Sequence, residues 1–433
     1  MTDTPRAPQL LRAIGRWSMV ALAINSILGS GIFGLPSVVA GLLGRWSPLA
    51  MVLAAGAMGV IIACYAEVAS QFTGTGGTYL YLREVFGRGV GLQVGWMTLL
   101  SRLTACAAAV NLLVVYLGEF WRGATEPGPR LLVTTLFIGI LAVINYRGVG
   151  AGAAVSNAAV VAKVLGLGVV CVAGGAYLSH HAMLAPVPVP VSADSWLKAL
   201  LLLLFAYGGY EAALNPMGEA RDPRRDVAFA LFIALLVVAA LYSSLQAIVI
   251  GTLADPARSA RPLADAARVV MGSGGATFVA LAALVSVYGY ISANLLTVPR
   301  GVFALAAGGD FPLLLARVHP RFRTPYLAIA VFALLLWGFA QFAGFAWNLT
   351  LSAVARTLFY GGVCAAVPVL RRRQPDADAF RLPGGPALPV LGVAICALLL
   401  SRADFSKSVV LLVTVVIGLA NWAAVRHRGR GGA

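Results

Sequence analysis

Long apolar stretches separated by short polar connections recur along the whole chain. A helix needs about 20 mostly apolar residues to cross the hydrocarbon core of a bilayer. On this basis the pattern predicts twelve spanning helices, at residues 17–43, 47–72, 90–120, 131–146, 152–178, 196–217, 227–252, 275–306, 325–343, 347–370, 387–402 and 408–425. No connection is long enough for a separate catalytic domain, so we expect an all-α polytopic membrane protein.

The composition supports a membrane location and excludes a soluble globule. Hydrophobic residues make up 60% of the 433 residues, charged residues only 11%, and the mean hydropathy is +0.87. Soluble proteins carry about 25% charged residues, so this chain has too little charge to cover its own surface. The net charge of +16 does not indicate nucleic-acid binding, because the basic residues cluster in short connections between apolar stretches.

The distribution of basic residues predicts the orientation in the membrane. If the N-terminus is cytoplasmic, 19 of the 32 Lys and Arg residues fall in cytoplasmic segments, nine on the opposite side and four within helices. Cytoplasmic segments are enriched in Lys and Arg. We therefore expect a multi-pass protein of the cell (inner or plasma) membrane with both termini in the cytoplasm.

Two predicted helices are interrupted by glycines near their middle. The first contains GSGIFGLP (29–36), and the sixth contains the pair Gly208–Gly209. Each glycine weakens a helix by about 1 kcal/mol relative to Ala. Broken backbone at membrane depth is tolerated only where it lines a cavity or is buried in protein. The two breaks lie five helices apart, which suggests two inverted repeats of five helices.

This reading divides the chain into five parts. They are a cytoplasmic tail at 1–16, a first repeat at 17–178 (helices 1–5), a second repeat at 196–370 (helices 6–10), two further helices at 387–425 and a tail at 426–433.

A broken helix exposes backbone amides on one half and carbonyls on the other. The amide end attracts a carboxylate and the carbonyl end an ammonium, and a zwitterionic amino acid supplies both groups. The expected amides are those of Ser30, Gly31 and Ile32, and the expected carbonyls lie near Ile27, Phe205 and Gly208. The alternative is that these glycines only allow close helix packing; two breaks in equivalent positions favour a binding site.

The string GSGIFG also matches the dinucleotide fingerprint, but such a loop follows a strand and has an acidic residue about 20 positions later. Here apolar helix surrounds it and the next acidic residue is Glu67. We expect neither a cofactor nor a metal.

Several segments resemble the amino acid–polyamine–organocation transporters, in the right order over roughly residues 15 to 385. These segments are GSGIFGLP, GTGGTYLYLREVFG (74–87), FAYGGYEAALNPMGEARDPRRD (205–226), GGDFP…HPRFRTP (308–325) and VLRRR (369–373). The resemblance implies a bacterial-type amino acid permease with a LeuT-type fold and alternating access. The AYGG core is similar to exchangers of neutral amino acids, whereas Glu211 resembles arginine/agmatine-type permeases, so both substrate classes remain open.

Lys163 lies midway along the fifth helix, where a charge is costly and therefore a functional candidate. In the family that the chain resembles, an amine at this place can occupy the position of sodium in sodium-coupled relatives, facing helices one and eight. This implies sodium-independent transport that can be linked to protons. The alternatives are that Lys163 only extends to the membrane interface, or that Ser292 and Thr297 keep a sodium site.

Glu211 follows the break in helix six and has three open roles. It could sense protons, attract a cationic substrate, or pair with Arg356 or another buried base. Arg102 and Arg356 themselves are expected to be structural partners, and Glu67 and Arg300 to form ion pairs at helix ends. Further pocket candidates are Ser26, Phe205 and Asn294, the last by resemblance.

The sequence therefore predicts a permease or exchanger for L-amino acids. A cationic amino acid or polyamine antiporter using Glu211 is the alternative, and a membrane sensor without flux is a further one. A channel would need charge rings or filter loops, and an enzyme would need clustered catalytic groups; neither pattern is visible. The expected partners are a small amino acid or amine, lipid and, in a coupled mechanism, protons, with no nucleic acid.

Overall fold

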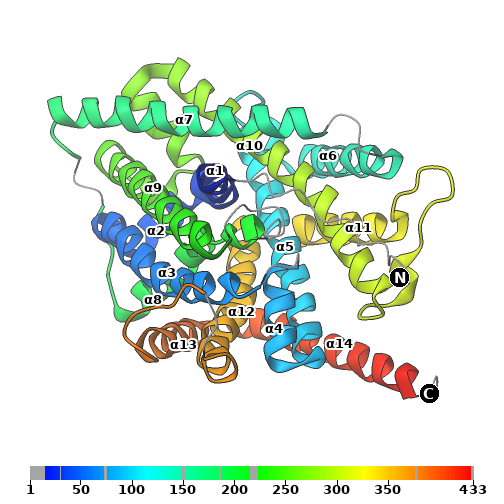
Figure 1. Ribbon diagram of the computed structural model, residues 1–433. Helices are drawn as coiled ribbons and strands as arrows, with labels where there is room; N and C mark the ends of the chain where they lie inside the picture. The colour runs from blue at the N-terminus through cyan, green and yellow to red at the C-terminus, as the bar shows by residue number, and fades with distance from the viewer. Residues whose placement is uncertain are drawn as a thin grey trace.

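The computed structural model describes residues 15–29, 31–72, 76–148, 152–184, 187–214, 223–375 and 379–430. Within these ranges the regular structure is helical (Figure 1). The α-helices are α1 (Arg16–Ile27), α2 (Gly31–Leu43), α3 (Ser47–Ser70), α4 (Gly77–Phe86), α5 (Arg88–Leu117), α6 (Pro127–Arg147), α7 (Gly152–His180), α8 (Ala193–Tyr207), α9 (Pro223–Thr252), α10 (Pro262–Ala307), α11 (Tyr326–Phe342), α12 (Phe345–Arg373), α13 (Ala387–Leu400) and α14 (Phe405–Arg430).

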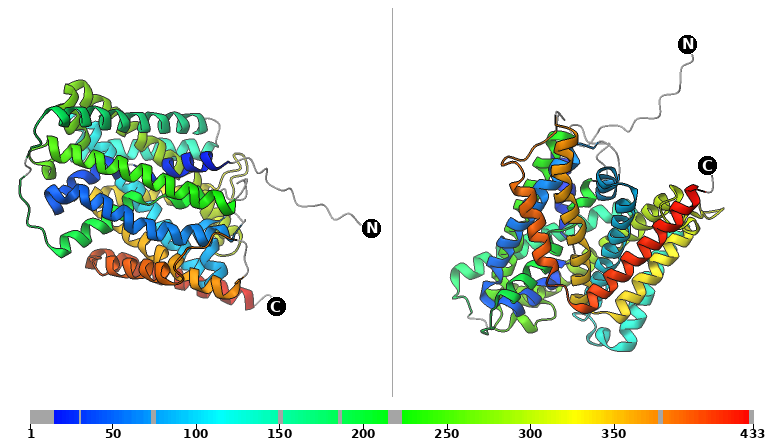
Figure 2. Two further views of the ribbon diagram at one scale, coloured as in Figure 1. Left: turned by 60° about the vertical axis from the view of Figure 1, so that its left-hand side comes forward. Right: turned by 90° about the horizontal axis from the view of Figure 1, so that it is seen from below.

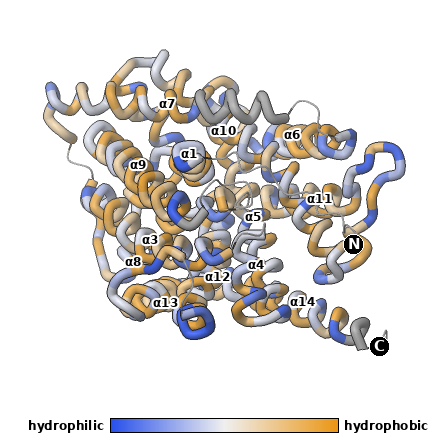
Figure 3. Tube along the Cα trace, in the orientation of Figure 1, coloured by the Kyte–Doolittle hydropathy of each residue, from blue (hydrophilic) through white to orange (hydrophobic). Residues whose placement is uncertain are grey.

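The outer helices expose large apolar side chains, as a protein solvated by lipid does. Leu236 on α9 is 67% exposed and Phe342 on α11 is 88% exposed. Figure 3 shows hydrophobic stretches along α9, α11 and α14, with hydrophilic residues gathered in connections such as the one between α10 and α11. In the described part of the chain, nine helical stretches are long and apolar enough to cross a membrane. The chain is a polytopic, multi-pass membrane protein.

Helix α5 lies at the centre of the bundle and packs against α10, α11, α12 and α14. On the other side of the bundle, α3 and α9 lie side by side and α1 packs against α9. The start of α1 and the end of α14 lie at the same end of the bundle (Figure 2).

Both expected interruptions are present in the backbone. Helix α1 ends at Ile27 and α2 begins at Gly31. Helix α8 ends at Tyr207 and is followed by a short 3-10 helix, η3 (Tyr210–Leu214). Gly209 between them has φ +109°, a conformation that side-chain-bearing residues rarely adopt.

Most helix boundaries lie within a few residues of the predicted ranges. Helix α4 was not predicted, α8 ends at Tyr207 rather than at 217, and among the predicted helices the start of α10 differs most. Helix α10 begins at Pro262 rather than at 275, and it is kinked at Gly272, where φ is +71°. The additional segment carries Asp265 and Arg268, so its composition does not mark it as spanning. It still forms a helix because it buries one apolar face, including Leu263 and Ala267.

Candidate functional site

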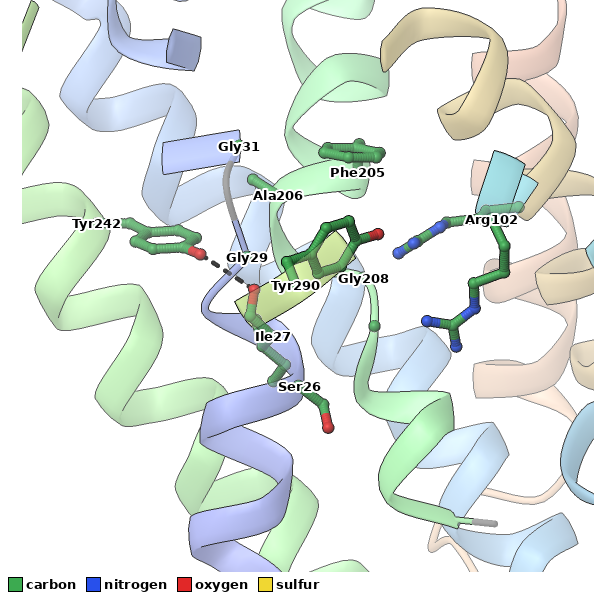
Figure 4. A pocket seen from close by; sticks show the side chains of 12 residues that line it. Ser26, Ile27, Gly29, Gly31, Arg102, Phe205, Ala206, Gly208, Tyr242 and Tyr290 are labelled. Atoms are coloured by element: carbon green, nitrogen blue, oxygen red, sulfur yellow. Dashed lines mark hydrogen bonds between the residues drawn. The ribbon is translucent and has the colours of Figure 1, made fainter. Parts of the chain in front are cut away.

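The two breaks touch each other deep in the bundle. A Cβ on Gly209 would lie 2.3 Å from the backbone oxygen of Ser26, and a Cβ on Gly31 would lie 3.0 Å from the Phe205 ring. Heavy atoms cannot approach to 2.3 Å without a bond between them, so glycine is required at position 209. The break between α1 and α2 therefore lies directly against the break after α8 (Figure 4).

The carbonyls at the end of α1 are held by two side chains from other helices. Nζ of Lys163 on α7 donates to the backbone oxygens of Asn25 (2.9 Å) and Leu28 (2.5 Å). The hydroxyl of Tyr242 on α9 donates to the oxygen of Ile27 (3.2 Å), as Figure 4 shows. Carbonyls at a helix C-terminus carry partial negative charge and suit an ammonium group. Lys163, only 9% exposed, thus fixes the end of α1.

Glu211 lies in η3 and is surrounded by donors. Its Oε2 accepts hydrogen bonds from the Gly209 amide (2.9 Å) and the Tyr360 hydroxyl (3.2 Å). Its Oε1 lies 3.6 Å from Nη2 of Arg102 and 3.7 Å from Nη1 of Arg356. Of the three roles considered for Glu211, the structure displays pairing with buried bases.

Arg356 on α12 is buried and held from several sides. Its Nε donates to Oγ of Ser101 at 3.0 Å, and its guanidinium lies 5.1 Å from the centre of the Phe205 ring. A Cβ on Gly208 would lie 2.3 Å from Nη1 of Arg356. The missing side chain at position 208 therefore makes room for this guanidinium beside the break.

Three cavities adjoin at Arg102. The first, of about 20 Å³, lies between the breaks; the second, of about 190 Å³, extends between α1, α7 and α10. The third, of about 640 Å³, lies between α4, α5 and α10 and is lined by Glu211 and Phe311. Arg102 lines all three cavities. Arg102 therefore lies between the largest of the three cavities and the breaks.

The structure gathers most of the expected site residues around these cavities. Ser26, Ile27, Gly31, Phe205 and Gly208 line the first, Ser26, Lys163 and Asn294 the second, and Glu211 the third. Ile32 is fully buried in the first turn of α2 and lines none of the three. Ser30 lies outside the described residues.

The two ends of the bundle differ in how they are closed. Away from the termini, Oγ of Ser37 on α2 donates to the oxygen of Ser259 (2.6 Å), next to η5 (Pro256–Arg258). Glu119, after α5, pairs there with Arg261 (3.3 Å) and Arg268 (2.6 Å). These contacts join α2 and the end of α5 to the residues around the start of α10.

At the end that carries the termini, ion pairs flank the largest cavity. Asp310 pairs with Arg83 (3.1 Å) and Arg88 (2.6 Å) and accepts a hydrogen bond from the Tyr79 hydroxyl. The expected helix-end pairs are found in part. Glu67 pairs with Arg371 at 2.6 Å, as expected. Arg300 donates to the Leu296 oxygen and has no acidic partner among the described residues.

Comparison with known proteins decides the family. A family model described as amino acid permease matches residues 14–421. The chain belongs to the amino acid permease family. The permease is 29% identical to the serine/threonine exchanger SteT of Bacillus subtilis over 430 residues, which cover 95% of each chain. It is 27% identical to the branched-chain amino acid permease BcaP of the same organism, over 95% of this chain and 92% of the relative.

A third relative carries a different kind of name. The permease is 24% identical to the methylthioribose transporter of Bacillus subtilis, over 90% of this chain and 88% of the relative. Relatives of similar identity are thus named for chemically different solutes, so the residues around the cavities of each chain have to be considered individually.

Sequence reasoning missed two residues that line the permease's first cavity. Arg102 and Arg356 were expected to be structural partners, and both lie within 3.7 Å of Glu211; their place at the cavities was not predicted. Tyr242 and Tyr290 line the first cavity and gave no signal, because a single tyrosine in an apolar helix is equally compatible with packing.

Proposed function

We propose that this permease is a secondary transporter that moves L-amino acids across the cell membrane by alternating access, as a permease or an exchanger. The observation that carries the proposal is the contact between the two breaks, Gly209 against the Ser26 carbonyl, beside cavities at the centre of an apolar bundle. Helix ends at that depth offer the partial charges of free backbone amides and carbonyls, which can bind charged groups of a substrate without charged side chains.

The breaks suit the main chain of an amino acid. The amides of Gly31 and Ile32 form the N-terminal end of α2, where a helix favours a carboxylate. The C-terminal ends of α1 and α8, at Ile27 and Tyr207, favour the ammonium group. Ile27 and Gly31 both line the first cavity. Its volume of about 20 Å³ is room for about one water, so a zwitterion would contact both helix ends once the surrounding side chains move apart.

The cavities support an alternating-access cycle. The largest cavity lies toward the end of the bundle that carries α4 and the termini, whereas the Ser37 and Glu119 contacts cover the opposite end. This arrangement corresponds to a state open to one side only. With both termini in the cytoplasm, as the basic residues predict, that state faces inward.

The proposed topology is twelve spans with a LeuT-type 5+5 inverted repeat. Nine described stretches are long enough to span, and the first of them, Gly31–Ser70, contains both α2 and α3. If α1 with α2 forms one interrupted span and α3 another, the eight other stretches and the shorter helices α11 and α13 bring the total to twelve. Chain ends on the same side of the bundle require an even number of spans (Figure 2).

Lys163 supports sodium-independent transport in this proposal. Its ammonium already contacts two carbonyls at the end of α1, where a bound cation would otherwise sit. Burial disfavours the charged form of an amine, so gain and loss of a proton at Lys163 would strengthen and release this contact during the cycle.

The second candidate, a cationic amino acid or polyamine carrier using Glu211, has less support. Two guanidinium groups lie within 3.7 Å of this carboxylate. A cationic substrate that approached Glu211 would be repelled by both of them.

Counterflow in proteoliposomes tests the proposal. Proteoliposomes that contain the purified permease are loaded with each unlabelled amino acid in turn. They should accumulate the same amino acid in labelled form without sodium. Gly31→Val and Gly208→Val should abolish counterflow, because Phe205 and Arg356 occupy the space beside these glycines. The matched control is Gly139→Val on α6, where a Cβ meets nothing within 4 Å. Normal transport by both site variants would remove the proposed site, and absence of counterflow for every amino acid would refute the function.

A further inference from the structure

The charged side chains that line the three cavities are unequally divided. Among the described residues, Arg102, Arg356 and Lys163 line them as bases, and Glu211 is the acid. Lys163 is directed to carbonyls of α1, which leaves two guanidinium groups facing one carboxylate. Excess charge in a buried site is costly unless a ligand compensates it.

Arg102 is the less satisfied of the two guanidinium groups. Arg356 donates to Ser101 and lies against the Phe205 ring. Arg102 makes no hydrogen bond within the described residues, and its 3.6 Å approach to Glu211 is too long for one. A guanidinium has five N–H donors, and this side chain is only 16% exposed. Its donors are therefore available to a ligand in the cavities.

Arg102 also has the right place for the side chain of a bound amino acid. It lies across the first cavity from α1 and Tyr242, with Tyr290 between them (Figure 4). Ser26 and Arg102 together line both the first and the second cavity. A main chain bound at the break thus has Arg102 on its far side. The second cavity, of about 190 Å³, exceeds the roughly 150 Å³ cavity that accommodates a benzene molecule.

We infer that the substrate is an amino acid with an anionic side chain, whose second carboxylate binds Arg102. This rests on the proposed function, since it assumes that the α-carboxylate binds at the break. A carboxylate matches the planar fork of a guanidinium with two parallel hydrogen bonds. It also compensates the excess positive charge, whereas a neutral side chain leaves the donors of Arg102 unpaired.

Pairs of nearly isosteric amino acids test the inference. In proteoliposomes, unlabelled glutamate should inhibit the uptake of labelled glutamate at least about ten-fold better than glutamine does, and aspartate and asparagine should differ in the same way. A hydrogen bond to a charged group is worth at least this factor. Arg102→Gln should remove that preference, and Arg102→Lys should retain part of it. Arg258→Gln is the control, because its side chain is 90% exposed on η5 and should leave the preference unchanged.

The outcomes separate this inference from the proposed function. Transport of neutral amino acids without preference for the acidic member of each pair would refute the inference of an anionic substrate, while the proposed transport function would stand. Retained preference in a folded Arg102→Gln protein would overturn the role of Arg102. If no amino acid is exchanged, the thermal shift of the purified protein decides. Stabilisation by glutamate or aspartate well above that by its amide supports the inference, and equal or absent stabilisation overturns it.

Discussion

Replacing Glu211 with glutamine should destabilise the protein strongly, because it removes the buried countercharge of two arginines. The carboxylate oxygen lies 3.6 Å from Arg102 and 3.7 Å from Arg356. With an effective dielectric constant of about 20, each approach is worth roughly 4–5 kcal/mol before desolvation is counted. Removing one partner of a buried pair costs about 3–5 kcal/mol net. We expect the free energy of unfolding to fall by an amount in that range and not more, because the glutamine can still accept the hydrogen bond from the Gly209 amide.

Unfolding of the detergent-solubilised protein, followed by tryptophan fluorescence in increasing denaturant, measures this loss. A Glu211→Gln/Arg356→Gln double variant should recover part of it, since it removes one of the unpaired charges, and the resulting cycle isolates the coupling between the two residues. Asp194→Asn is the control, because its pairs with Lys198 and Arg402 are surface pairs and contribute little. Wild-type stability of Glu211→Gln would show that Glu211 is not the ionised partner of these arginines, and the reasoning would be wrong.

Three further predictions concern other parts of the site and the topology. Lys163→Met removes both hydrogen bonds to α1 and should abolish pH-driven accumulation; wild-type behaviour across pH, or strict sodium dependence of the wild type, would contradict the coupling role. Gly209→Ala should eliminate counterflow, because the new Cβ conflicts with the Ser26 oxygen and because φ at this position is +109°; the backbone strain alone costs about 1–3 kcal/mol. Gly139→Ala should transport normally. Activity of Gly209→Ala would disprove the close contact of the breaks. A reporter fused after Ala433 should be active only in its cytoplasmic form, and external activity would reverse the proposed topology.

The helices and the two breaks could be predicted because their causes are local. Apolar length defines a spanning helix, and the glycine-rich string at 29–36 and the pair Gly208–Gly209 disfavour continuous helix. The start of α10 was missed because Asp265 and Arg268 hide its apolar face from a measure of average hydrophobicity.

The partners of the charged residues could not be predicted, because they depend on how distant helices pack. Glu67 and Arg371 are separated by 304 positions, and Arg356 donates to a serine 255 positions away. The sequence shows that Arg102 lies within an apolar helix, but not that it borders three cavities. That property depends on the rotation of α5 relative to α1 and α10, which no local pattern encodes.

The contact between the breaks involves the main chain, since Gly209 approaches a backbone oxygen. Arg102 and Arg356, by contrast, belong to α5 and α12, which continue without interruption through this region. Under the proposed function, main-chain recognition and solute discrimination therefore belong to separate helices. Substitutions on α5 and α12 would then change the chemical preference of the pocket while the apposed glycines stay as they are. One scaffold would in this way acquire new substrates by exchange of a few side chains, with the two breaks unchanged.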